Sequence, residues 1–169
     1  MSSRRIGVIG AGSWGTALAD CLSRNGHAVR LWSHEIEVAD AIREQHRNEA
    51  YLHGVELDPR LEASPDLAEV LDRAEVVVSV SPSEFVRATM ERARSCLPTD
   101  PFLLVSASKG LELDTDLRMS EVLLQVLGGE VAEGCVVLSG PSFAAELARQ
   151  RPTAVTLASR SEEMAIATQ

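Results

Sequence analysis

Short runs of apolar residues alternate along the chain with stretches in which apolar residues recur at helical spacing. The runs predict strands at Arg5–Ile9, Ala28–Trp32, Glu75–Val80, Phe102–Ser106, Cys135–Ser139 and Pro152–Ser159. The helical spacing predicts helices at Trp14–Arg24, Glu35–Gln45 and Leu117–Leu127, with others starting at Ser64-Pro65, Ser81–Glu84 and Ser161. Because the strand runs are apolar throughout, they predict an α/β fold with a doubly wound, mostly parallel sheet covered on both faces.

Two prolines and one polar stretch add detail to these elements. Pro65 and Pro82 are expected at the first position of their helices, because proline suits that position. The segment Ser81-Pro82-Ser83-Glu84 also has the spacing of a capping box. Residues 46–64 are polar and irregular, so they predict a loop with a short strand near Leu61.

The composition is that of one globular domain spanning residues 1–169. The net charge of −9 weighs against binding to nucleic acid or an anionic membrane, which needs clustered basic residues. Cys21, Cys96 and Cys135 are odd in number and far apart, which favours a reducing, cytoplasmic location. No apolar run approaches the ~20 residues of a membrane span. Strand-like sequence from Arg5 onwards leaves no room for a signal peptide, so we expect no membrane insertion.

The first strand is followed directly by a glycine-rich turn. The segment Gly10-Ala11-Gly12-Ser13-Trp14-Gly15 matches G-x-G-x-x-G and opens an amphipathic helix. In such a turn Gly10 permits the tight bend, Gly12 lets backbone approach a pyrophosphate, and Gly15 allows close helix–strand packing. The alternative is a glycine-rich turn without a ligand. The strand-turn-helix context favours a dinucleotide site.

The end of the second strand bears on the choice of cofactor. A site that prefers NAD usually carries Asp or Glu there, about 20 residues past the glycine turn. Here Ser33 and His34 occupy that place, with Arg43 and Arg47 as further basic groups for a 2′-phosphate. The alternative is that Ser33 only caps the next helix and His34 is solvated. We therefore favour NADP and keep NAD as the alternative.

Lys109 is the only lysine in a chain whose other basic residues are all arginine or histidine. It follows the Phe102–Ser106 strand, and ligands of open parallel sheets lie beyond the carboxyl ends of strands. A compact ammonium with three donors can meet a phosphate or carbonyl where a planar guanidinium does not fit. The alternative is an ordinary surface lysine. Position and rarity favour a ligand contact.

A second strand-to-helix turn follows at Ser139-Gly140-Pro141-Ser142 and offers N–H groups and a hydroxyl to an anion. Taken alone, it can equally be a capped structural turn. His27, His46 and His53 show no spacing typical of metal ligands, so we expect no metal site.

Taken together, these segments resemble the bacterial-type NAD(P)-dependent glycerol-3-phosphate dehydrogenases. The resemblance is carried, in order along the chain, by Ile9–Ala19, Leu31–His34, Val80–Ser83, Ala107–Glu112, Leu138–Glu146 and Pro152–Val155. It implies a Rossmann-type domain and the interconversion of sn-glycerol 3-phosphate and dihydroxyacetone phosphate, a small-molecule reaction that supplies phospholipid synthesis. Ser108 and Ser142 stand where the family more often has Thr, which keeps the hydroxyl.

The resemblance also implies roles for individual residues. Ser13, Trp14, His34 and Ala144 are implied cofactor contacts, Gly140 and Ser142 are implied substrate contacts, and Lys109 is implied to contact both.

The family's helical second domain, which carries the proton-transferring lysine, is expected to be absent from this chain. We therefore assign no catalytic residue to these 169 residues and expect the chain alone to be inactive. Two alternatives stay open, a non-catalytic NAD(P)-sensing module and a β-hydroxyacid or 6-phosphogluconate type of dehydrogenase. The oligomeric state is also open, with a homodimer as one alternative.

Overall fold

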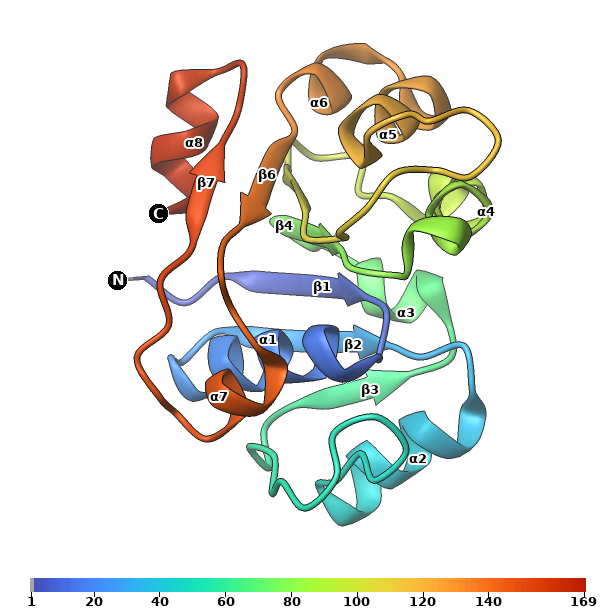
Figure 1. Ribbon diagram of the computed structural model, residues 1–169. Coiled ribbons are helices and arrows are strands. Elements are labelled where there is room, and N and C mark those ends of the chain that lie inside the picture. Colours follow the sequence, from blue (N-terminus) through green and yellow to red (C-terminus); the bar gives the residue numbers. More distant parts are fainter. Residues whose placement is uncertain (1) are drawn as a thin grey trace.

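The apolar runs pair into one seven-stranded sheet in the computed structural model, which describes residues 2–169 (Figure 1). The strands are β1 (Arg5–Ile9), β2 (Ala28–Trp32), β3 (Glu62–Ser64), β4 (Val76–Ser79), β5 (Leu103–Ser106), β6 (Val136–Ser139) and β7 (Thr156–Ala158). They lie in the order β3-β2-β1-β4-β5-β6-β7, and all neighbours are parallel except β7, which is antiparallel to β6. This confirms the predicted α/β fold with a mostly parallel sheet.

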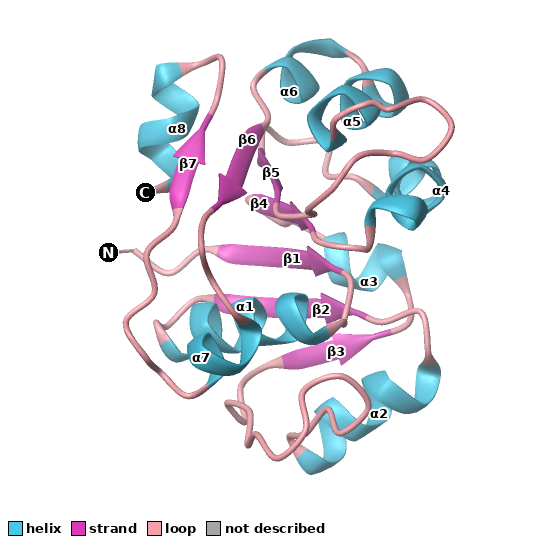
Figure 2. Cartoon of the chain, in the orientation of Figure 1, coloured by secondary structure: helices cyan, strands magenta, loops and turns pink. Residues whose placement is uncertain are grey.

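Helices cover both faces of the sheet (Figure 2). They are α1 (Ser13–Arg24), α2 (Ile36–Gln45), α3 (Leu67–Leu71), α4 (Ser83–Ala93), the 3-10 turn η1 (Arg94–Cys96), α5 (Met119–Leu127), α6 (Gly129–Glu133), α7 (Ala144–Ala148) and α8 (Glu162–Thr168). Buried residues of α1, α2 and α7 form one core, and those of α3, α4 and α5 form the other. None of the helices among residues 2–169 is both long and apolar enough to cross a bilayer.

Alternation along the central strands supplies both cores. In β4, Val76 and Val78 belong to the core on the α1 side, whereas Val77 belongs to the core on the α4 side. In β1, Val8 and Ile9 divide in the same way. Because successive side chains of a strand point to opposite faces, a strand buried on both faces must be apolar at every position. The unbroken apolar runs therefore have a direct structural cause.

The strand order reverses direction between β1 and β4, which are neighbours in the sheet. The connection from β1 runs through α1 to β2 on one side, while the chain after β4 continues through α4 to β5 on the other. The two connections separate at the carboxyl ends of β1 and β4 and leave space there, which is where ligands of such sheets bind. The glycine turn follows β1 at this point.

Both predictions about proline at the start of a helix are wrong. Ser64 ends β3, and α3 begins only at Leu67, with Asp66 as its cap accepting from the Ala68 N–H at 2.9 Å. Pro82 is the capping residue of α4 and not its first helical residue, and no side chain caps that helix. The Ser81 hydroxyl donates to the Ile9 carbonyl instead, so the predicted capping box at Ser81–Glu84 does not form.

Other boundaries differ because tertiary contacts decide them. The predicted strand Pro152–Ser159 shrinks to β7, because only Thr156–Ala158 pair with β6. The helix predicted from Leu117 begins at Met119, since the Leu117 carbonyl accepts from the Glu112 N–H and closes a turn. The short strand expected near Leu61 is confirmed as β3. The sequence did not predict α6.

Candidate functional site

The glycine turn after β1 is built by two glycines that the fold requires. Gly10 has φ of +126°, and a Cβ there would lie 3.0 Å from the Ser81 amide nitrogen. A Cβ on Gly15 would overlap the Gly10 carbonyl oxygen, so α1 can lie this close to β1 only with glycine at that position. These are the roles in bending and close packing that the motif predicts.

Gly12 differs from both, because the fold does not need it. Its φ is −66°, which any residue adopts, and a Cβ there would meet no atom within 4 Å. The open space in front of Gly12 lies at the start of α1. The Thr16 N–H is the first in this helix to donate back along the chain, and its acceptor is the Gly12 carbonyl. The N–H groups before Thr16 have no partner within the helix and face an anion-binding position. The turn is therefore shaped as a phosphate cradle that a side chain at Gly12 would fill.

A residue that the sequence analysis missed holds this turn in place. Asn48, which is 2% exposed, donates to the Ala11 carbonyl at 2.9 Å and to the Thr16 hydroxyl at 2.8 Å. The Thr16 hydroxyl donates in turn to the same Ala11 carbonyl. Asn48 lies in the polar stretch 46–64, and nothing in that local pattern indicates a contact with a turn far away in sequence.

A cleft of about 330 Å³ opens between the glycine turn and the segments that follow β5 and β6. The predicted residues Gly12, Ser13, Trp14, Gly15, Lys109, Ser142 and Ala144 all line it. The Lys109 ammonium lies 5.7 Å from the centre of the Trp14 ring and donates to the Ser142 carbonyl at 3.4 Å. The Ser142 hydroxyl is buried and has no hydrogen-bond partner among the described residues. An ammonium and an unused hydroxyl therefore meet at the start of α1.

The segment carrying Lys109 is fixed to α4 by a bidentate ion pair. Arg87 of α4 donates to the two carboxylate oxygens of Glu112 at 2.7 and 2.8 Å. Together with a bond from the Thr115 hydroxyl, this contact lowers the pKa of Glu112 from 4.5 to about 2. At the start of the segment, the Ser108 hydroxyl donates to the Ser81 carbonyl at 2.6 Å. Lys109 thus stands on a loop anchored at both ends.

Gly140 does not line the cleft, but it shapes the turn that does. Its φ is +151°, and a Cβ there would lie 2.8 Å from the Ala154 carbonyl oxygen. Its own carbonyl accepts from the Ser142 N–H at 2.9 Å. Gly140 therefore has a structural reason to be glycine, and its predicted substrate contact stays a prediction.

A second cleft, of about 450 Å³, starts at the glycine turn and runs along α4. It is lined by Gly10, Ala11, Gly12, Trp32, His34, Glu35, Tyr51, Ser81, Pro82, Phe85, Ala88, Thr89 and Arg92. Gly12 lines both clefts, so the two open to either side of the phosphate cradle. A ligand with a central pyrophosphate and a group at each end matches this arrangement.

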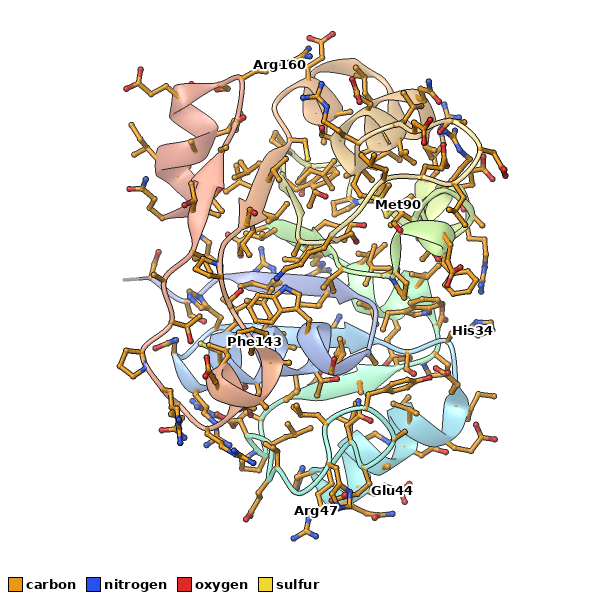
Figure 3. The ribbon with its side chains drawn as sticks, in the orientation of Figure 1. His34, Glu44, Arg47, Met90, Phe143 and Arg160 are labelled. Atoms are coloured by element: carbon orange, nitrogen blue, oxygen red, sulfur yellow. The ribbon has the colours of Figure 1, made fainter. Side chains whose placement is uncertain are left out.

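Of the four residues expected near the ribose, only His34 lines the second cleft. His34 lines the second cleft, but Ser33 is 0% exposed and its hydroxyl donates to Glu35, so it does not face a ligand there. Arg43 is paired with Asp40, and Arg47 lies at the opposite end of α2 from His34 (Figure 3). Neither arginine lines the cleft. The structure therefore does not support help from Arg43 or Arg47 at the ribose, which stays a prediction.

Glu35 and Tyr51 form one wall of the second cleft, and the sequence analysis assigned neither of them. The Tyr51 hydroxyl donates to Glu35 at 2.6 Å, and this bond lowers the pKa of Glu35. The carboxylate is therefore charged at neutral pH. An ionised acid does lie near the end of β2, although it comes two residues later than the Ser33 position.

The strand order, the glycine turn and the clefts at the reversal point define the class of the protein. It is a dinucleotide-binding domain of the Rossmann type. A family model described as NAD-dependent glycerol-3-phosphate dehydrogenase N-terminus matches residues 5–165, and the chain belongs to this family. The predicted resemblance is thereby confirmed, and the cofactor class is a nicotinamide dinucleotide.

Individual relatives agree with the family assignment. The chain is 49% identical over 160 residues to a glycerol-3-phosphate dehydrogenase (NAD(P)+) of Syntrophotalea carbinolica, which covers 95% of this chain and 48% of that protein. The crystal structure of glycerol-3-phosphate dehydrogenase from Coxiella burnetii superposes with a TM-score of 0.88 at 33% identity, covering 98% of this chain and 50% of that one. The chain therefore spans about half the length of the relatives it matches.

A structural neighbour outside the family shares only the fold. A pyrroline-5-carboxylate reductase from Coxiella burnetii has a TM-score of 0.70 at 15% identity, covering 99% of this chain and 54% of that one.

Proposed function

We propose that this chain is the dinucleotide-binding domain of a dehydrogenase that interconverts sn-glycerol 3-phosphate and dihydroxyacetone phosphate. The observation that carries the proposal is the convergence of Lys109, the unpartnered Ser142 hydroxyl and the start of α1 on one cleft. Relatives named glycerol-3-phosphate dehydrogenase support it. The combination of a cation, a hydroxyl donor and a nearby redox cofactor suits a phosphorylated three-carbon substrate.

The residues present fit a nicotinamide dinucleotide. The open cradle at Gly12 and the N–H groups at Ser13 and Trp14 would hold the pyrophosphate, and Ala144 would contact the end nearer Lys109. When bound, the nicotinamide ring supplies the hydride acceptor or donor for the substrate carbon. The chain's own contribution is to orient both partners at the switch point of the sheet.

In this proposal Lys109 binds and orients the substrate and is not the proton-transferring group. Its ammonium is directed at the cleft by contacts with Trp14 and Ser142, where it offsets negative charge on the substrate oxygen as the hydride moves. No other lysine exists in these 169 residues, so we assign no proton-transfer residue to them. General acid–base help of that kind is worth about 10²–10⁴ in rate.

Three further points belong to the proposal. We favour NADP over NAD, because Ser33 and His34, and not an acid, occupy the two positions directly after β2. We place the protein in the cytoplasm, which suits the free thiols of Cys21, Cys96 and Cys135. We leave a homodimer as one alternative for its assembly.

The test uses NMR on the chain saturated with NADPH. Addition of millimolar dihydroxyacetone phosphate should shift the backbone amide signals of Lys109 and Ser142, and dihydroxyacetone without the phosphate should not. Lys109→Met should abolish the shift at Ser142 while NADPH still binds. Amide signals at both residues that stay unchanged with the phosphate would contradict the proposed substrate, and would favour a module that only binds the nucleotide.

A further inference from the structure

Arg92 stands at the far end of the second cleft, away from Lys109. It projects from α4 on the same stripe as Phe85, Ala88 and Thr89, which also line the cleft. Seven residues separate Phe85 from Arg92, which corresponds to about 10 Å along a helix. The cleft is therefore lined along α4 from the phosphate cradle at one end to a guanidinium at the other.

The guanidinium of Arg92 is held without being neutralised. Its central carbon lies 5.5 Å from the centre of the Trp32 ring, within the range of a cation–π contact. It makes no hydrogen bond or ion pair with any residue whose side chain is described. Arg43, Arg87 and Arg118, in contrast, are each paired with a carboxylate. A positioned arginine with unused donors in an acidic protein is available to an anion.

Trp32 gives Arg92 a rigid platform. It is the last residue of β2, it is 4% exposed, and its indole nitrogen donates to the Pro65 carbonyl at 2.9 Å. The ring of His34 lies beside it, with the two ring centres 6.1 Å apart. A planar guanidinium stacked on a fixed ring loses little freedom when it binds a ligand. The geometry thus resembles a preformed site.

The same cleft also carries a negative charge. Glu35 accepts hydrogen bonds from the Tyr51 and Ser33 hydroxyls, which hold its carboxylate at the cleft. An anion entering this cleft is therefore attracted by Arg92 and repelled by Glu35. A neutral hydroxyl at the same place gains from Glu35, which can accept its proton, and gains little from Arg92.

We propose that Arg92 binds the 2′-phosphate of NADPH, and that Arg92 and Glu35 together set the choice between NADPH and NADH. The inference rests on the proposed function in one respect, namely that the pyrophosphate lies at Gly12 with the nicotinamide toward Lys109. The adenosine half then occupies the second cleft, and the 2′-phosphate on its ribose enters a cleft that both Arg92 and Glu35 line. The residue proposed to bind the phosphate thus comes from α4, and the acid that opposes it comes from the segment after β2.

The test compares the dissociation constants of NADPH and NADH for the wild-type chain, Arg92→Gln and Glu35→Gln. The Trp14 and Trp32 fluorescence provides the readout, so no turnover is needed. Loss of a charge-assisted bond to phosphate should weaken NADPH binding about 10- to 100-fold in Arg92→Gln, and should change NADH binding less than twofold. Glu35→Gln should strengthen NADPH binding and weaken NADH binding.

Arg94→Gln serves as the matched control, because Arg94 is an exposed arginine two residues further on that does not line the cleft. It should leave both constants unchanged. Equal weakening of NADPH and NADH in Arg92→Gln would mean that Arg92 only stacks on the adenine, and would overturn the inference. Unchanged NADPH binding would overturn it as well. A wild-type chain that binds neither nucleotide would instead overturn the proposed function.

Discussion

The three glycines of the turn after β1 belong to one sequence motif, but each is glycine for a different reason. A Cβ on Gly15 would run into the Gly10 carbonyl, and Gly10 itself has a φ of +126°. Gly12 faces open space in an ordinary backbone conformation. Two of the glycines are thus explained by the fold alone, and the third is explained only by something that approaches from outside.

We predict that Gly15→Ala is destabilising and that Gly12→Ala is not. The methyl group at position 15 forces α1 away from β1, and overpacking of this kind costs about 1–3 kcal/mol of unfolding free energy. The same methyl group at position 12 meets no atom within 4 Å, and the replacement of glycine by alanine should leave stability equal or slightly higher. Urea unfolding of the two variants measures both effects. Equal losses of stability would show that the two sites do not differ as described.

At the scale of single residues, the sequence predicts what depends on local backbone and misses what depends on distant partners. Gly12, Lys109 and Ser142 could be predicted because each stands at a fixed offset from the end of a strand. Asn48 and Arg92 could not, because each acts on a segment far away along the chain.

At the scale of elements, the connection between α4 and the segment after β5 depends on one ion pair. Arg87 holds Glu112 with two hydrogen bonds, and the pKa of Glu112 falls from 4.5 to about 2. A carboxyl whose pKa is lowered by folding stabilises the native state above its unfolded pKa. That contribution is lost as the pH falls from about 5 towards 2.

We therefore predict that Glu112→Gln removes a pH-dependent part of the stability. The variant should melt at a lower temperature than the wild type at pH 7, and the difference should shrink as the pH falls to 3. Asp100→Asn, which changes an exposed aspartate in the loop before β5, is the control and should follow the wild type at every pH. Thermal melts followed by circular dichroism between pH 7 and pH 3 provide the measurement. A constant difference across that range would contradict the ion-pair explanation.

Residue patterns predict the positions of the central strands more closely than they predict where helices begin. The central strands were predicted within one or two residues, because burial on both faces forces an unbroken apolar run. Helix starts were predicted less well. Pro82 meets the rule for a first helical residue, yet it caps α4, because Ser81 is drawn to the Ile9 carbonyl. Residues 46–64 look unstructured because their polar groups form tertiary bonds, as Asn48 does with the glycine turn.

At the scale of the whole molecule, the sheet places two clefts on either side of one phosphate cradle. The order of the strands brings the ends of β1 and β4 together, and Gly12 is shared by the cleft of Lys109 and the cleft of Arg92. The alternation of strands and helices predicted the fold class. It could not predict which residues of α4 and the 46–64 loop would line the second cleft, since this depends on how helices pack across the sheet.

The central claim is that the cradle at Gly12 binds a nicotinamide dinucleotide, and calorimetric titration of NADPH into the wild-type chain and Gly12→Val tests it most directly. A Cβ at position 12 would meet no protein atom within 4 Å, so the branched side chain should occupy the space proposed for the pyrophosphate without disturbing the fold. The account predicts saturable binding by the wild type and none by the variant, with both melting at the same temperature. Binding to Gly12→Val within a few-fold of the wild type would contradict it.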